Sequence, residues 1–251
     1  MESGNVMGTT SDNHFSDLIV LDGGMGRELE RQGAPFRQPE WSALALYEAP
    51  DAVRSVHASF IAAGADYITT NTYAIVPFHI GMEQYAKDGR RLLQLAVQLA
   101  RQARDGADIT SAAGRAVQIL GSIPPICGSY EPQSFLADAA EPVVNDFLDV
   151  FLDRDGVDAL LLETVGSLQE ACCYMRCIHK RNEQRSLPIW ISFCLGTEEG
   201  FDKKPKLLSG ETVSDAVDLV FQQFAPQQPV EAVLFNCCDM RLVTPALQEA
   251  R

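Results

Sequence analysis

Short apolar segments alternate with longer segments of mixed polarity along most of the chain. Six of the short segments are rich in residues with high β-propensity and are bounded by glycine or polar residues: 18–22, 66–73, 117–123, 158–164, 188–194 and 231–237. Nearly continuous apolar character, in place of strict alternation, is typical of parallel strands covered on both faces. We therefore predict six parallel β-strands.

The longer segments predict helices. Apolar residues recur at helical spacing over residues 51–64, 83–104, 143–151 and 217–224. Ser167 and Glu170 have the spacing of a capping box, which predicts that a helix starts after the fourth strand. Thr244 followed by Pro245 predicts the start of a last helix, because proline is favoured in the first helical turn.

Alternating strands and helices predict a parallel α/β fold in one domain. Polar residues occur at the predicted carboxyl end of every strand: Asp22, Asn71, Thr72, Ser122, Glu163, Thr164, Ser192, Asn236 and Cys237. Polar tips on all strands fit the mouth of an α/β barrel better than the single crevice of an open sheet. Two alternatives remain, because a barrel has eight strands. The chain is either a (β/α)8 TIM-barrel type fold with about six of its eight βα units, or a six-stranded open sheet.

A nucleotide-binding sheet is the weakest interpretation of this pattern. Gly24 and Gly26 follow the first strand as in a dinucleotide-binding turn, but Leu29 occupies the place of the third glycine. The next predicted strand is also too distant to close a short βαβ unit, and the sequence contains no phosphate loop.

Composition and charge exclude several classes of protein. Hydrophobic residues make up 46% of the chain and charged residues 22%, which is globular composition. The net charge of −14 disfavours binding to nucleic acids or anionic membranes, and no apolar run is long enough to span a bilayer. Seven cysteines without a secretory signal indicate reduced thiols in the cytoplasm. We interpret residues 1–17 as a flexible leader and 18–251 as the domain.

Six short motifs then resemble, in order, the signature of the homocysteine S-methyltransferases. They are Leu21–Gly26, Thr70–Tyr73, Gly121–Ile123, Glu163–Thr164, Ser209–Glu211 and Asn236–Cys237, and the resemblance extends from Leu18 to Leu247. The family's fold is a (β/α)8 barrel, in agreement with the pattern of strands and helices. By this resemblance, residues 18–251 would be a homocysteine-binding barrel, incomplete at its carboxyl-terminal end.

The resemblance implies a reaction and a metal. Homocysteine would accept a methyl group from S-methylmethionine or S-adenosylmethionine to give methionine, a step of methionine biosynthesis. A thiol attacks as its thiolate, and a zinc ion that binds the sulfur keeps it deprotonated at neutral pH. In the family, three cysteines hold this Zn²⁺, and the motif makes Cys237 the first of them.

The amino acid end of homocysteine needs other partners. A carboxylate at a strand tip holds an ammonium group well, and Asp22 and Glu163 are the candidates. Amides in the turn at Gly23 and Gly24, where no side chain obstructs approach, are candidates for the substrate carboxylate. By resemblance, Asp22, Gly23, Thr72 and Glu163 line the homocysteine pocket.

The sequence departs from the family at the other two zinc ligands. The family supplies them from a Gly-Gly-Cys-Cys-Gly stretch on the eighth strand, and this sequence has no such stretch. Cys194 ends the strand beside Cys237 and is the nearest substitute, whereas Cys172, Cys173 and Cys177 belong to a helix away from the strand tips. The alternative function is therefore a catalytically inactive truncated barrel that acts at most as a binding or interaction remnant.

Overall fold

The structure, a computed structural model, describes residues 18–107, 114–196 and 204–250, so the predicted leader at 1–17 lies outside it. Five parallel strands form one sheet, in the order β1 (Tyr67–Thr69), β2 (Gln118–Ile123), β3 (Ala159–Val165), β4 (Ile189–Phe193) and β7 (Val230–Phe235). The first predicted strand, 18–22, is not a regular strand, but it extends this order through a parallel bridge from Leu21 to Tyr67 of β1. The predicted strands therefore lie side by side in chain order.

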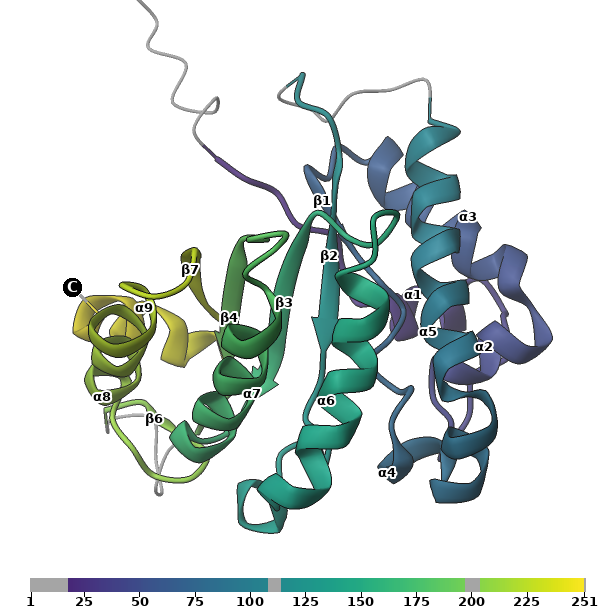
Figure 1. Cartoon of the computed structure of the whole chain (residues 1–251). Helices are drawn as coiled ribbons and strands as arrows, with labels where there is room; N and C mark the ends of the chain where they lie inside the picture. The colour runs from purple at the N-terminus through teal and green to yellow at the C-terminus, as the bar shows by residue number, and fades with distance from the viewer. Residues whose placement is uncertain (1–17, 108–113, 197–203, 251) are drawn as a thin grey trace, which may run out of the picture.

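Helices connect the strands and cover the sheet, as the periodicity predicts. They are α1 (Met25–Arg31), α2 (Ala43–Glu48), α3 (Pro50–Ala62), α4 (Pro77–Ile80), α5 (Met82–Asp105), α6 (Ala137–Phe151), α7 (Leu168–Arg181), α8 (Val213–Asp218) and α9 (Met240–Glu249). A π-helix over Leu219–Phe224 continues α8, and a small antiparallel pair, β5 (Leu195–Gly196) and β6 (Lys206–Leu207), follows β4. Figure 1 shows α5, α6 and α7 packed against one face of the sheet. None of the described helices is long and apolar enough to cross a membrane.

The two faces of the sheet are packed differently. Successive side chains of a strand point to opposite faces, so Ile119 of β2 joins the large core under the helices while Leu120 points the other way. On that second face, Leu120, Leu161 and Trp190 form a smaller apolar cluster, and the ring of Tyr67 lies 4.6 Å from that of Trp190. This inner cluster corresponds to the filling of a barrel.

The α/β prediction is confirmed, and the sheet is open rather than closed. Its edges are the segment 18–22 and β7, and these do not pair with each other within the described residues. The strands next to the middle of the sheet are buried, whereas most residues of β7 are half-buried. The edge strand thus has the exposure expected where a barrel wall is interrupted.

One predicted helix start and one predicted capping box differ from the structure. The last helix begins at Met240 and not after Thr244, because the side chain of Asp239 accepts a hydrogen bond from the amide of Arg241 and caps it. Pro245 therefore lies inside this helix. Ser167 caps α7 as predicted. The side chain of Glu170, however, accepts a hydrogen bond from the amide of Gly166 and not from that of Ser167, so the capping box is not formed.

Candidate functional site

The predicted site residues lie at one edge of the sheet. Asp22 ends the segment 18–22, Thr72 follows β1, Glu163 lies in the last part of β3 and Cys237 follows β7. Carboxyl ends of parallel strands meet at the same edge, which is where ligands bind in α/β proteins. Electrostatic interactions link these residues. The charge of Glu163 raises the pKa of Asp22, and the charges of Glu163 and Cys237 raise the pKa of Tyr73.

Asp22 and Glu163 form a pair of carboxyl groups. Asp22 accepts hydrogen bonds from the amide of Thr69 at 2.7 Å and from its hydroxyl at 2.9 Å, while Glu163 accepts one from the hydroxyl of Ser122 at 2.5 Å. Among the residues that the structure describes, neither carboxylate has an ion-pair partner. Two neighbouring acidic groups without a cation are suited to a positively charged ligand.

The electrostatics of this pair follow from burial. Burial raises the pKa of Asp22 to about 7, the charge of Glu163 adds to the rise, and the hydrogen bonds from Thr69 oppose it. Burial also raises the pKa of Glu163, against the bond from Ser122. An ammonium group between the two carboxylates would replace the hydration that they lose, so this arrangement favours a bound amine.

Gly23 and Gly24 leave the chain accessible beside Asp22. Both glycines are exposed, and a Cβ atom on Gly24 would meet no atom within 4 Å. A Cβ atom on Gly23 would come within 2.9 Å of the ring of Phe60, so this position requires glycine or a shift of the ring. The turn at the start of α1 thus offers bare backbone to a ligand.

Thr72 is fully buried and bonds to the protein itself. Its hydroxyl donates to the carbonyl of Ser122 at 2.7 Å and lies 2.9 Å from the hydroxyl of Thr70. These bonds tie the end of β1 to β2, so Thr72 supports the strand that carries Ser122 and its partner Glu163. A direct contact of Thr72 with substrate stays a prediction.

Cys237 is exposed and is held by its neighbour Asn236. The side-chain amide of Asn236 donates to the sulfur of Cys237 at 3.5 Å and to the hydroxyl of Thr164 at 2.8 Å. Its carbonyl oxygen accepts from the hydroxyl of Ser192 at 2.8 Å. Asn236 is therefore fixed by β3 and β4, and it fixes the thiol in turn. Cys237 has a left-handed φ of 50°, which turns the chain out of the strand at this point.

Two tyrosines complete the site, and sequence reasoning missed both. The hydroxyl of Tyr73 bonds with that of Ser129 at 2.8 Å, and Tyr130 interacts electrostatically with Cys237. Burial raises the pKa of both phenols, so they stay protonated. The signal in the sequence is their position: Tyr73 ends the motif Thr70–Tyr73, and Tyr130 lies in the stretch Gly128–Pro132, which also resembles the family.

The described residues do not complete a zinc site at Cys237. Cys194 lies close, but its thiol donates to the backbone carbonyl of Cys237 at 3.3 Å. Burial, with the nearby sulfurs of Cys237 and Cys238, raises the pKa of Cys194 to about 12. In the described ranges, the set of three ligand atoms within 4.8 Å of one another comes from Glu141, Cys173 and Cys177, on α6 and α7. Cys237 as a zinc ligand therefore stays a prediction, and we derive no reaction step through a metal.

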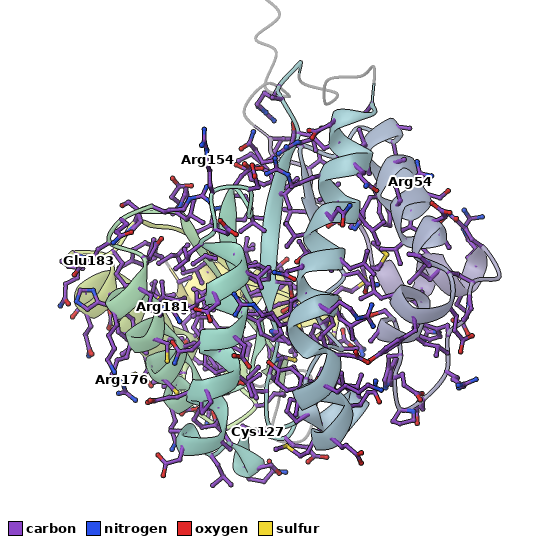
Figure 2. All side chains as sticks on the ribbon, turned by 45° about the vertical axis from the view of Figure 1, so that its right-hand side comes forward. Arg54, Cys127, Arg154, Arg176, Arg181 and Glu183 are labelled. Atoms are coloured by element: carbon purple, nitrogen blue, oxygen red, sulfur yellow. The ribbon has the colours of Figure 1, made fainter. Side chains whose placement is uncertain are left out.

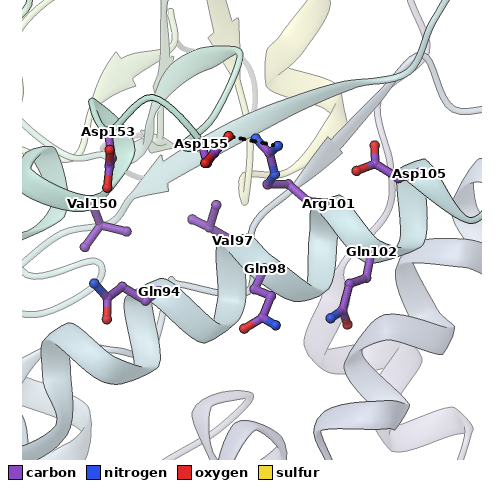
Figure 3. Close-up of a pocket in the computed structure, with 9 residues that line it drawn as sticks. All are labelled: Gln94, Val97, Gln98, Arg101, Gln102, Asp105, Val150, Asp153 and Asp155. Atoms are coloured by element: carbon purple, nitrogen blue, oxygen red, sulfur yellow. Dashed lines mark hydrogen bonds and ion pairs between the residues drawn. The ribbon is translucent and has the colours of Figure 1, made fainter.

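A cavity of about 390 Å³ lies elsewhere, between α5 and the end of α6 (Figure 3). It is polar, and Arg101 pairs with Asp155 across it at 3.4 Å. Its lining comprises Gln94, Val97, Gln98, Arg101, Gln102, Asp105, Val150, Asp153 and Asp155. It includes none of the predicted site residues, so it is separate from the site at the strand ends.

Comparison with known proteins gives concordant results. The family model described as homocysteine S-methyltransferase matches residues 19–251. Homocysteine S-methyltransferase YbgG from Bacillus subtilis is 34% identical over 253 residues, which cover 93% of this chain and 73% of that protein. Homocysteine S-methyltransferase 1 from Arabidopsis thaliana is 29% identical over 245 residues, covering 89% of this chain and 69% of the relative.

A solved structure agrees with these sequence matches. The metallated form of the homocysteine methyltransferase MmuM from Escherichia coli superposes with a TM-score of 0.69 at 27% identity. The superposition covers 92% of this chain and 78% of that one. The parallel sheet and the helices that cover it therefore belong to a fold shared with that enzyme.

Proposed function

Because the chain belongs to the homocysteine S-methyltransferase family, and is thus related to methyltransferases, we propose that it binds homocysteine at the carboxyl ends of its strands. There it would receive a methyl group from S-methylmethionine or S-adenosylmethionine, giving methionine. The observation that carries the proposal is the pair of acidic groups, Asp22 and Glu163, which interact electrostatically and have no ion-pair partner in the described part of the chain. An amino acid brings the ammonium group that this pair lacks.

The chain's own residues would orient the substrate. Asp22 and Glu163 hold the ammonium group, and the exposed amides at Gly23 and Gly24 are free to approach the carboxylate. Tyr73 lies within electrostatic reach of both Glu163 and Cys237, so the acidic pair and the thiol belong to one mouth. Homocysteine carries its amino group and its sulfur at opposite ends, which matches this separation of an acidic pair from a thiol.

The sulfur end of the substrate would lie near Cys237. A zinc ion bound there, when present, supplies the acidity that keeps the substrate sulfur as a thiolate at neutral pH. The exposed sulfur of Cys237, oriented by Asn236, is suited to be one ligand of that ion. The other ligands would come from outside the set of described residues near Cys237.

A methyl-transfer assay with bound zinc measured in parallel tests the proposal. The chain is purified from zinc-supplemented medium, and L-homocysteine is supplied with S-methylmethionine or with S-adenosylmethionine while methionine formation is followed. We expect methionine formation with one of the donors, and about one zinc per chain fewer in Cys237→Ser than in the parent chain. Homocysteine binding without methionine formation would favour the alternative, a binding remnant. If the chain neither binds homocysteine nor transfers the methyl group, both functions are contradicted.

The affinity for the amino acid should rise with pH because of Asp22. Its pKa is raised to about 7, so the group is mostly protonated at pH 6 and ionised at pH 8. Only the ionised form attracts an ammonium group, and we expect methionine, a product without a titrating thiol, to bind about tenfold more tightly at pH 8. Calorimetry at the two pH values measures this ratio.

Asp22→Asn should weaken methionine binding. It should also reduce the ratio of the affinities at pH 8 and pH 6 to less than about threefold, because only Glu163 of the acidic pair then titrates. Asp51→Asn is the matched control, since Asp51 lies exposed in the first turn of α3, and it should keep the full ratio. A parent chain with equal affinity at both pH values would show that Asp22 does not contact the ammonium group.

A further inference from the structure

A second group of metal-ligating side chains lies away from the strand ends, between α6 and α7. Figure 1 shows these two helices side by side on the outer face of the sheet. Cys173 and Cys177 are one turn apart on α7, and Glu141 belongs to the first half of α6. Residues four apart on a helix share a face, so both thiols point to the same neighbour.

The three side chains form a compact cluster. Their ligand atoms all lie within 4.8 Å of one another, and Cys173 and Cys177 interact electrostatically. Two donor atoms that bind one tetrahedral zinc ion at about 2.3 Å are about 3.8 Å apart. Side-chain rotations that move the ligand atoms by about an ångström therefore bring them to the spacing of ligands on one bound ion.

The surroundings suit a site that is closed on one side and open on the other. Cys173 and Cys177 are 0% and 3% exposed, whereas Glu141 is half-buried and borders solvent. Within the described residues, Glu141 has no ion-pair partner. Arg176 and Lys180 act electrostatically on Cys177, and Arg176 projects from α7 at the surface (Figure 2). These cations offset part of the charge of two thiolates and a carboxylate.

We propose that Glu141, Cys173 and Cys177 form a second metal site, for a thiophilic divalent cation such as Zn²⁺, that joins α6 to α7. Two thiolates and one carboxylate supply three ligands, and water takes the fourth position on the open side. Sulfur ligands favour zinc over magnesium or calcium, which bind to oxygen. The site is independent of Cys237, and its occupancy stabilises the packing of the two helices on each other.

Cobalt titration of the whole, reduced chain tests the proposal in a Cys237→Ser background, which removes the thiol at the strand ends. Co²⁺ replaces Zn²⁺ and gives a thiolate charge-transfer band and strong visible bands when it is tetrahedral. We expect one equivalent of Co²⁺ to produce these bands and to raise the midpoint of thermal unfolding. Absence of the charge-transfer band with cobalt in excess overturns the proposal.

Second substitutions in this background assign the ligands. Adding Cys173→Ser should weaken cobalt binding by at least about 100-fold, and adding Glu141→Gln by about tenfold. Cys172→Ser is the matched control, because Cys172 lies on the same helix outside the cluster, and it should change nothing.

If Cys173→Ser does not fold, Glu141→Gln decides the outcome, because Glu141 is half-buried on the surface of α6 and its substitution leaves the core intact. Unchanged binding in Glu141→Gln together with a loss in Cys172→Ser would place the ion elsewhere and overturn the assignment. No methyl transfer is measured, so failure here leaves the proposed function untouched.

Discussion

Cys237→Ser should lower methyl transfer by at least about 100-fold, the largest effect that we expect of any single substitution. Substitution of a group that only supports a metal ligand costs 10- to 100-fold, and a direct ligand costs at least as much. Serine keeps the Cβ atom but replaces a soft sulfur by a hydroxyl, which binds zinc poorly. Rates with each donor and zinc per chain measure the effect.

The fold should be unaffected by this change. The side chain of Cys237 is exposed, so serine leaves no cavity, and we expect the midpoint of thermal unfolding to stay within about 1 °C. Cys238→Ala is the matched control: Cys238 packs partly against the core, so alanine should lower stability slightly and leave transfer unchanged. Normal transfer by Cys237→Ser would remove Cys237 from the reaction.

Glu163→Gln should weaken amino acid binding by about 30- to 150-fold, which corresponds to the loss of about 2 to 3 kcal/mol from one charge-assisted hydrogen bond. Glutamine has the same shape and can still accept the bond from Ser122, so the substitution removes only the charge. Calorimetry with methionine measures the change. The matched control is Glu231→Gln, since Glu231 lies at the start of β7, at the opposite edge of the sheet.

The same variant should be more stable than the parent at high pH. The pKa of Glu163 is raised in the folded state, so the folded chain holds this proton more tightly than the unfolded chain, and stability falls as pH rises through the folded pKa. Glutamine does not titrate, and the advantage of the variant in unfolding temperature should therefore grow with pH. Weaker binding together with lower stability would instead indicate that Glu163 supports the fold.

Local patterns in the sequence were sufficient for the elements and for the edge that carries the site. Five of the six predicted strands are strands of the sheet, the segment 18–22 joins it by a single bridge, and Ser167 caps α7, because strand burial and helix caps depend on residues close in sequence. Pattern failed where two local signals competed. Asp239 caps α9 ahead of Thr244, and Pro245 is then accommodated within the helix.

The chemistry of the site needed the tertiary structure. The sequence indicated Asp22 and Glu163 as separate candidates, but their mutual repulsion and the raised pKa of each arise from burial at one strand edge. The contact of Tyr130 with Cys237 likewise joins segments far apart in sequence.

For the cysteines of α7, too, the sequence predicted the position and only the structure showed the contacts. The sequence places Cys173 and Cys177 on one helix away from the strand tips, which is confirmed. It gives no indication that Glu141 of another helix lies within 4.8 Å of both. The sequence by itself determined the α/β elements, their order and the family, because periodicity and motifs are local. Only the tertiary structure decided which charges and thiols meet, because burial and proximity depend on how the helices and strands pack.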